Sequence, residues 1–198
     1  MLTRRLAVEF KQKDAAAVMR TMVAEPYASS EFVNWKASPL TLITRSHVNH
    51  VPTLTGGVGR KNLNRFYHDF FMPSNPPSLE VRLVSRTIGI DRVVDEMIVS
   101  FRHTQEVPWM LPGVPPTDKL VEVALVSIVR VHGGKLEHEH VYWDQASVLV
   151  QIGALDPKMV PKALKAKGMQ RLPVAGREAA RKVLDEGSHP SNELIPKW

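Results

Sequence analysis

Apolar side chains recur along the chain at helical and strand spacings, which predict where its elements lie. The clearest helix is expected over residues 60–71, where one broad apolar face is formed by Leu63, Phe66, Tyr67, Phe70 and Phe71. The proline-rich run after Met72 ends it. Helices are also expected over 14–23 and 145–155.

Alternating or continuous apolar runs predict five strands, over residues 40–44, 79–87, 93–104, 121–131 and 136–143. Residues 121–131 are apolar on both faces in the middle, as in a central strand. The glycine-rich segment 51–59 indicates a loop. Helices followed by a run of antiparallel strands predict the α+β class. We therefore predict one domain over residues 1–157, and a C-terminal extension of three short helical pieces over 158–198 that is not an independent domain.

Composition excludes several classes of site. The 198 residues suit one domain, and the absence of cysteine rules out disulfides, thiolate zinc sites and a cysteine nucleophile. The N-terminus is no secretory signal, and no run approaches the ~20 apolar residues of a membrane helix, so we expect a cytoplasmic protein without a membrane partner. The net charge is +6, but the basic stretch 158–182 lacks aromatic side chains for stacking on bases. No nucleic-acid partner is expected.

The strand over 136–143 carries an unusual row of polar side chains. Residues two apart on a strand share a face, which groups Leu136 with His138, His140, Tyr142 and Asp144. Burial of two imidazoles and a carboxylate without partners is costly, so an inward face indicates function. An outward face makes the same residues ordinary surface. Because Val141 and Trp143 occupy the opposite face, periodicity leaves both possibilities open.

Three short motifs carry a resemblance to a known family. Residues 133–155, GGKLEHEHVYWDQASVLVQIGAL, resemble the SnoaL-like signature of a GK(I/L) turn, a strand ending in an aromatic residue and Asp, and a helix closing on Q(L/I)G. His103-Thr104 followed by residues 115–119 resembles the family's "H-T…PPTGK" segment, and His50 falls where the family often carries a histidine. His138 and His140 depart from the Glu and Trp that the family pattern leads us to expect.

The resemblance implies the fold of the nuclear-transport-factor-2-like superfamily. That fold is a cone-shaped, curved antiparallel sheet with N-terminal helices around an apolar cavity. It also implies cofactor-free acid–base catalysis, namely cyclisation, isomerisation, dehydration or hydrolysis of an apolar carbonyl or polyketide-like substrate. On this basis the expected catalytic residues are Asp144, His140 and His103. The expected substrate-binding residues are His50, His138, Tyr142, Trp143, Phe101 and Trp109.

Each of these residues also has a structural interpretation. Asp144 is a good N-cap for the helix that follows it. The histidines of the 137–140 run suit a solvated surface, and the aromatic residues suit packing. Asp95 shares a face with His103 and can orient it, but neutralisation by Arg92 or Arg86 is the favoured role.

Two other functions remain open. A metal-dependent enzyme can use His138, His140 and Asp144, with His50 or His103 as a fourth ligand. The second glycine-rich strand pair of a cupin is missing, however, so we expect neither a cofactor nor a tightly bound metal. The other is a non-catalytic ligand-binding or dimeric pocket protein, since a fold does not fix function.

A homodimer is expected from the apolar character of both faces of the strand over 121–131. A curved sheet whose concave face lines a pocket must also cover its convex face, and two-fold association is a common solution. The C-terminal extension is the alternative cover, but its excess of Lys and Arg makes it a poor one. Light scattering at micromolar concentration that returns the 22.2 kDa monomer mass would contradict the dimer.

Overall fold

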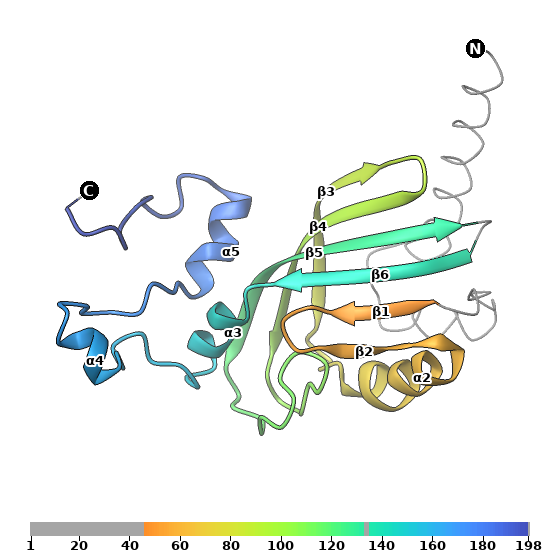
Figure 1. Ribbon diagram of the computed structural model, residues 1–198, viewed down its shortest axis with the longest axis horizontal. Coiled ribbons are helices and arrows are strands. Elements are labelled where there is room, and N and C mark those ends of the chain that lie inside the picture. Colours follow the sequence, from red (N-terminus) through yellow and green to blue (C-terminus); the bar gives the residue numbers. More distant parts are fainter. Residues whose placement is uncertain (1–45, 133–134, 198) are drawn as a thin grey trace, which may run out of the picture.

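The structure is a computed structural model that describes residues 46–132 and 135–197. Six strands form one sheet in the order β2-β1-β6-β5-β4-β3 (Figure 1). The strands are β1 (His47–His50), β2 (Thr55–Val58), β3 (Glu80–Ile88), β4 (Arg92–Arg102), β5 (Leu120–His132) and β6 (Lys135–Trp143). The last four confirm the predicted strands. The helix expected over 14–23 and the strand expected over 40–44 lie outside the described residues.

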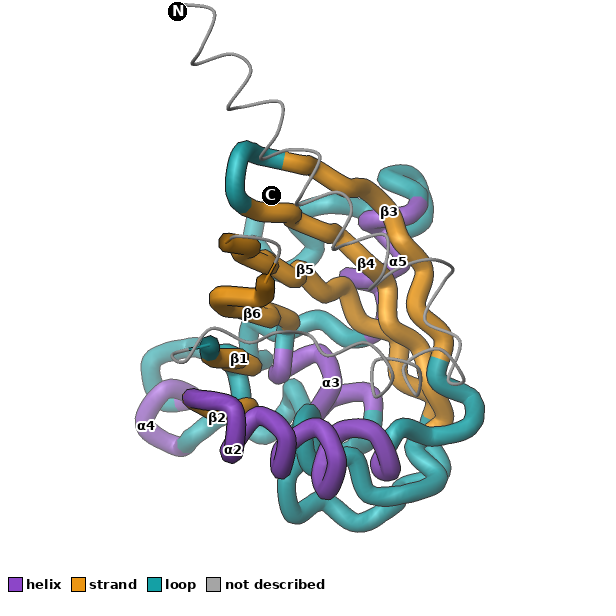
Figure 2. Tube along the Cα trace, turned by 90° about the vertical axis from the view of Figure 1, so that its right-hand side faces the viewer, coloured by secondary structure: helices purple, strands orange, loops and turns teal. Residues whose placement is uncertain are grey.

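The sheet is curved and does not close on itself (Figure 2). It is a mixed sheet, whereas the resemblance implied an antiparallel one. All neighbouring strands are antiparallel except β1 and β6, which run parallel. The segment expected to be a loop over 51–59 contains β2, an edge strand paired with β1. Gly56 permits this pairing, because it has φ +130° and a Cβ there would lie 2.0 Å from the Val48 carbonyl oxygen.

The described helical segments are α2 (Gly59–Arg65), the π-helical η2 (Phe66–Phe71), the 3-10 turn η3 (Met72–Ser74), α3 (Gln145–Gln151), α4 (Lys162–Lys165) and α5 (Arg177–Leu184). The helix predicted over 60–71 is confirmed in position, although its second half widens into π geometry. The helix predicted over 145–155 ends at Gln151. Beyond residue 157 the described chain holds two helices rather than the predicted three. None of the helices described is long and apolar enough to cross a membrane.

The C-terminal extension packs against the sheet through α5. Arg177 and Arg181 approach the Glu122 carboxylate on β5, at 3.6 and 3.5 Å. The Ser147 hydroxyl donates to the Gly176 carbonyl, and Ala180 is buried. The extension therefore covers part of β5, which is the alternative to dimerisation named above. The homodimer stays a prediction.

One face of the sheet, called the inner face below, packs against α2, η2 and the segment 107–111. Along β5 every second side chain from Val121 to Val131 is buried, whereas the side chains between them are partly exposed on the outer face. The buried set meets its counterparts on β4 and the helices, including Val93, Met97, Phe101, Leu63 and Phe66. Residues 121–131 are therefore apolar on both faces but fully buried on only one.

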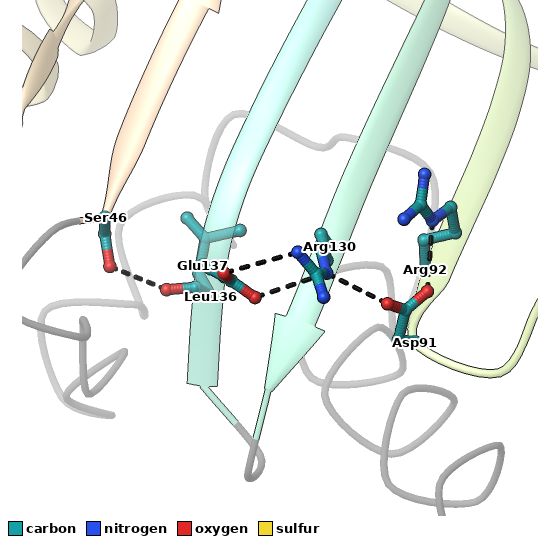
Figure 3. Close-up of polar contacts among 6 residues, drawn as sticks. All are labelled: Ser46, Asp91, Arg92, Arg130, Leu136 and Glu137. Carbon is teal, nitrogen blue, oxygen red and sulfur yellow. Dashed lines mark hydrogen bonds and ion pairs between the residues drawn. The ribbon is translucent and has the colours of Figure 1, made fainter. Parts of the chain in front are cut away.

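A bulge between β5 and β6 decides which residues face the core. Arg130 pairs with His138 and Val131 with Leu136, so Glu137 is an additional residue on β6. Leu136 is consequently buried in the inner core, while His138 turns to the outer face. Figure 3 shows the contacts around the bulge: Glu137 pairs with Arg130, Arg130 also binds Asp91 at 2.9 Å, and the Ser46 hydroxyl donates to the Leu136 carbonyl at 2.7 Å.

Candidate functional site

The bulge separates the residues that the sequence had grouped. His138, His140 and Tyr142 lie on the outer face, opposite to Val141 and Trp143, and Tyr142 is 41% exposed. Of the two directions left open for this row, the structure therefore shows the outward one for His138, His140 and Tyr142. The catalytic roles given to His140 and Asp144 stay predictions.

Asp144 is exposed and lies just before α3. Its Oδ1 accepts a hydrogen bond from the Ser147 backbone N–H at 3.1 Å, which satisfies one of the free donors of the helix start. The N-cap interpretation of Asp144 is thus confirmed.

His50 lies on the inner face within a ring of aromatic side chains. It is 3% exposed, and its ring centroid lies 5.4–5.9 Å from those of Phe66, Phe71, Trp109 and Trp143. We call these five residues the aromatic box. Burial lowers the pKa of His50 to about 4, so the imidazole is neutral at neutral pH. Of the predicted substrate-binding residues, the box therefore unites His50, Trp109 and Trp143.

The hydrogen bonds of His50 indicate its tautomer. The Thr53 and Thr55 hydroxyls both donate to the Trp109 carbonyl at 2.9 Å. Thr55 Oγ1 also lies 3.0 Å from His50 Nδ1 and 3.0 Å from Thr53 Oγ1. When Thr55 donates to the Trp109 carbonyl, it accepts from the Nδ1–H of His50, and the lone pair of the ring then lies on Nε2.

A carboxyl group that the sequence reasoning missed lies on the same face. Glu139 pairs with Val48 and Val129, both buried. Its Oε1 accepts from the Ser127 hydroxyl at 2.9 Å and its Oε2 from the Tyr67 hydroxyl at 3.2 Å. Burial raises the pKa of Glu139, the two hydroxyl hydrogen bonds oppose this, and the charge of Asp95 adds to the rise.

Asp95 is the second inner-face carboxylate and is only 2% exposed. Arg86 binds it in bidentate fashion, with Nε to Oδ1 at 2.6 Å and Nη2 to Oδ2 at 2.8 Å. Arg92 instead binds Asp91. Neutralisation of Asp95 by an arginine was the favoured interpretation, and it is confirmed for Arg86.

Tyr67 joins Glu139 to the aromatic box. Its hydroxyl contacts Glu139, and its ring lies 5.4 Å from Phe66 and 5.5 Å from Phe71. The candidate site, called the inner-face site, comprises the aromatic box with Tyr67, Glu139, Ser127, Asp95 and Arg86. It combines an apolar wall, a neutral histidine and two carboxyl groups in different electrostatic surroundings.

His103 and Phe101 are fully buried at the end of β4. His103 Nδ1 lies 3.1 Å from the Thr117 hydroxyl, and burial lowers the pKa of the imidazole. Its Nε2 has no hydrogen-bond partner among the described residues. The backbone of His103 also pairs with Asp118 and Lys119, which fixes the 115–119 segment of the sequence motif. Its predicted catalytic role stays a prediction.

The ligand set considered for a metal enzyme is divided by the fold. His138 and His140 lie on the outer face, Asp144 caps α3, and His50 lies on the inner face. Over residues 46–132 and 135–197, no group of three or more His, Asp or Glu side chains is arranged to hold a metal ion.

No family model and no curated protein matches the chain. Solved structures do resemble it. A candidate SnoaL-like polyketide cyclase from Jannaschia sp. CCS1 has a TM-score of 0.50 at 18% identity, over 74% of this chain and 94% of that one. A candidate polyketide cyclase from Acidithiobacillus ferrooxidans has a TM-score of 0.50 at 17% identity, over 72% and 96%. The described chain thus shares its fold with these two candidate polyketide cyclases, which confirms the fold that the sequence resemblance implied.

Proposed function

We propose that this chain is an enzyme that moves protons on an apolar carbonyl substrate without a cofactor, with Glu139 as its acid–base group. The observation that carries the proposal is the carboxyl group of Glu139, which has a raised pKa, is held by two hydroxyls, and lies beside the aromatic box. The two structural relatives described as candidate polyketide cyclases support the substrate class.

The different partners of the two carboxylates give them different tasks. Arg86 offsets the charge of Asp95, whereas the partners described for Glu139 are hydroxyl groups. A carboxyl group with a raised pKa is a stronger base when ionised and a usable acid when protonated. Glu139 is therefore the group that takes a proton from carbon next to the substrate carbonyl and returns it. Asp95 favours the protonated state of Glu139 through its negative charge.

His50 supplies the second polar contact for the substrate. In the tautomer with the proton on Nδ1, its Nε2 carries a lone pair, and its low pKa keeps the ring neutral. A neutral imidazole in an aromatic box accepts a hydrogen bond from a hydroxyl or enol without the desolvation cost of a charge. We therefore give His50 the role of orienting the substrate, with the aromatic rings holding its apolar part.

The proposal is tested by carbon–hydrogen exchange. The protein is incubated in D₂O with an apolar aryl ketone such as 1-tetralone, and deuterium entering next to the carbonyl is followed by NMR. Glu139→Gln preserves the shape of the side chain, replaces one acceptor oxygen by an NH2 donor and cannot take up a proton, so we expect the catalysed rate to fall by about 10²–10⁴-fold. Glu96→Gln is the matched control, because Glu96 accepts from Ser85 on the outer face. It is expected to exchange like the wild type.

Two outcomes would count against this function. Full exchange activity in the Glu139→Gln variant would remove Glu139 from the chemistry. Binding of the ketone by the wild type without any exchange would favour the second candidate function, a non-catalytic ligand-binding protein, which the aromatic box alone supports.

A further inference from the structure

Three imidazoles gather on the outer face where β1 lies beside β6. His47 on β1 is directly opposite His138 in the register, and His140 follows two residues along β6. Ring centroids are 5.2 Å apart for His47 and His138, 5.3 Å for His47 and His140, and 4.7 Å for His138 and His140. All three side chains are partly exposed. We call them the histidine cluster.

The closest approach in the cluster joins two ring nitrogens. His47 Nε2 and His140 Nε2 are 3.1 Å apart. Two imidazole nitrogens at this distance either share a proton in a hydrogen bond or share a metal ion. With metal–nitrogen bonds of about 2.0–2.1 Å, this separation corresponds to a nitrogen–metal–nitrogen angle of about 100°. That angle lies between the octahedral and tetrahedral values, and reaching it requires the rings to tilt, because centroids 5.3 Å apart place the two nitrogens nearly in line between the rings.

The charged groups near the cluster are paired with one another. Arg130 lies opposite His138, but its charge is offset by Asp91 and Glu137. Neutral imidazoles with available lone pairs are ligands for copper, nickel and zinc ions.

We propose that His47 and His140 form a two-imidazole binding site for a first-row divalent ion such as Cu²⁺, Ni²⁺ or Zn²⁺ on the outer face of the sheet. Water completes the coordination. The rings of His138 and His140 are stacked, so His138 becomes a third ligand only if its ring rotates. The site is separate from the inner-face site and does not depend on the proposed function. It differs from the alternative ligand set of His138, His140 and Asp144, which the fold divides.

Metal binding there would fasten β1 to β6. β1 is only four residues long and carries His47 on the outer face and His50 in the aromatic box. An ion that bridges His47 and His140 adds a bond between two segments 93 residues apart. Because it binds the folded chain, it raises the thermal midpoint in a concentration-dependent manner.

The test uses the full chain without an affinity tag and Cu²⁺ as the probe. Isothermal titration is expected to show one equivalent bound, and the electron paramagnetic resonance spectrum should show coupling to at least two nitrogens. His47→Asn and His140→Asn are each expected to weaken binding at least tenfold and to abolish the rise in thermal midpoint. His132→Asn is the control, since His132 is exposed at the end of β5.

Titration of the wild-type chain provides a second measurement, which does not depend on whether a variant folds. Substoichiometric Cu²⁺ should broaden the imidazole NMR signals of His47 and His140 before those of His68 and His189. The proposal is overturned if Cu²⁺ does not bind, if the asparagine variants bind like the wild type, or if broadening begins at other histidines. Any of these results would leave the 3.1 Å contact as a hydrogen bond between two rings.

Discussion

Replacing Arg86 by methionine is expected to lower the free energy of unfolding by about 3–5 kcal/mol. Asp95 is 2% exposed, and Arg86 meets both of its carboxylate oxygens. Methionine retains much of the apolar stem of the side chain but leaves a buried carboxylate without its cation. Urea unfolding followed by circular dichroism at pH 7 measures the change.

The double variant Arg86→Met/Asp95→Leu separates loss of the ion pair from loss of packing. With both charges removed, most of the lost stability should return, because an apolar pair of similar size avoids the desolvation cost. Arg92→Met is the matched control. Its ion pair with Asp91 is half exposed, so the expected change is within about 1 kcal/mol. An Arg86→Met variant as stable as Arg92→Met would show that Asp95 does not depend on Arg86.

Much of the fold follows from side-chain periodicity in the sequence. The apolar face of residues 60–71 and the alternation along β5 are long patterns. Their apolar side chains pack on the core, so the pattern predicts the buried positions. Two features could not be found in this way. β2 reads Thr-Gly-Gly-Val, and its two glycines leave no alternation of apolar and polar side chains. The parallel pairing of β1 with β6 joins segments about 90 residues apart, which periodicity does not reveal.

The candidate site was predicted in its apolar part and missed in its acidic part. Trp109, Trp143 and His50 were expected to bind substrate, and they do share the aromatic box. Glu139 was passed over because the row with His138, His140 and Tyr142 was assigned to the pocket, and Glu139 lies on the opposite face. Placing Trp143 on the inner face would have found it, since residues 139, 141 and 143 share one face and only the first is charged. A single additional residue in a strand leaves too weak a sequence signal to predict which face of the strand turns toward the core.

Acidification is expected to destabilise the protein chiefly through His50. The pKa of this imidazole is about 4 in the folded chain and 6.5 as a reference for the unfolded one. Between these values the unfolded state binds more protons, so stability is fully present above about pH 6.5 and is lost as the pH falls toward about 4. From pH 7 to pH 4.5 the loss from this one group is roughly 2–3 kcal/mol.

His50→Phe removes the titrating group and keeps an aromatic ring in the aromatic box, so the variant should lose roughly 2–3 kcal/mol less than the wild type over that pH range. Its stability at pH 7 is expected to be somewhat lower, since the hydrogen bond to Thr55 is lost. The comparison therefore rests on the change with pH, measured by urea unfolding at pH 7, 5.5 and 4.5. His68→Phe is the control, because His68 is exposed. The same acid loss in the His50→Phe variant as in the wild type would mean that His50 is not a buried neutral imidazole, and its role in orienting the substrate would fall with it.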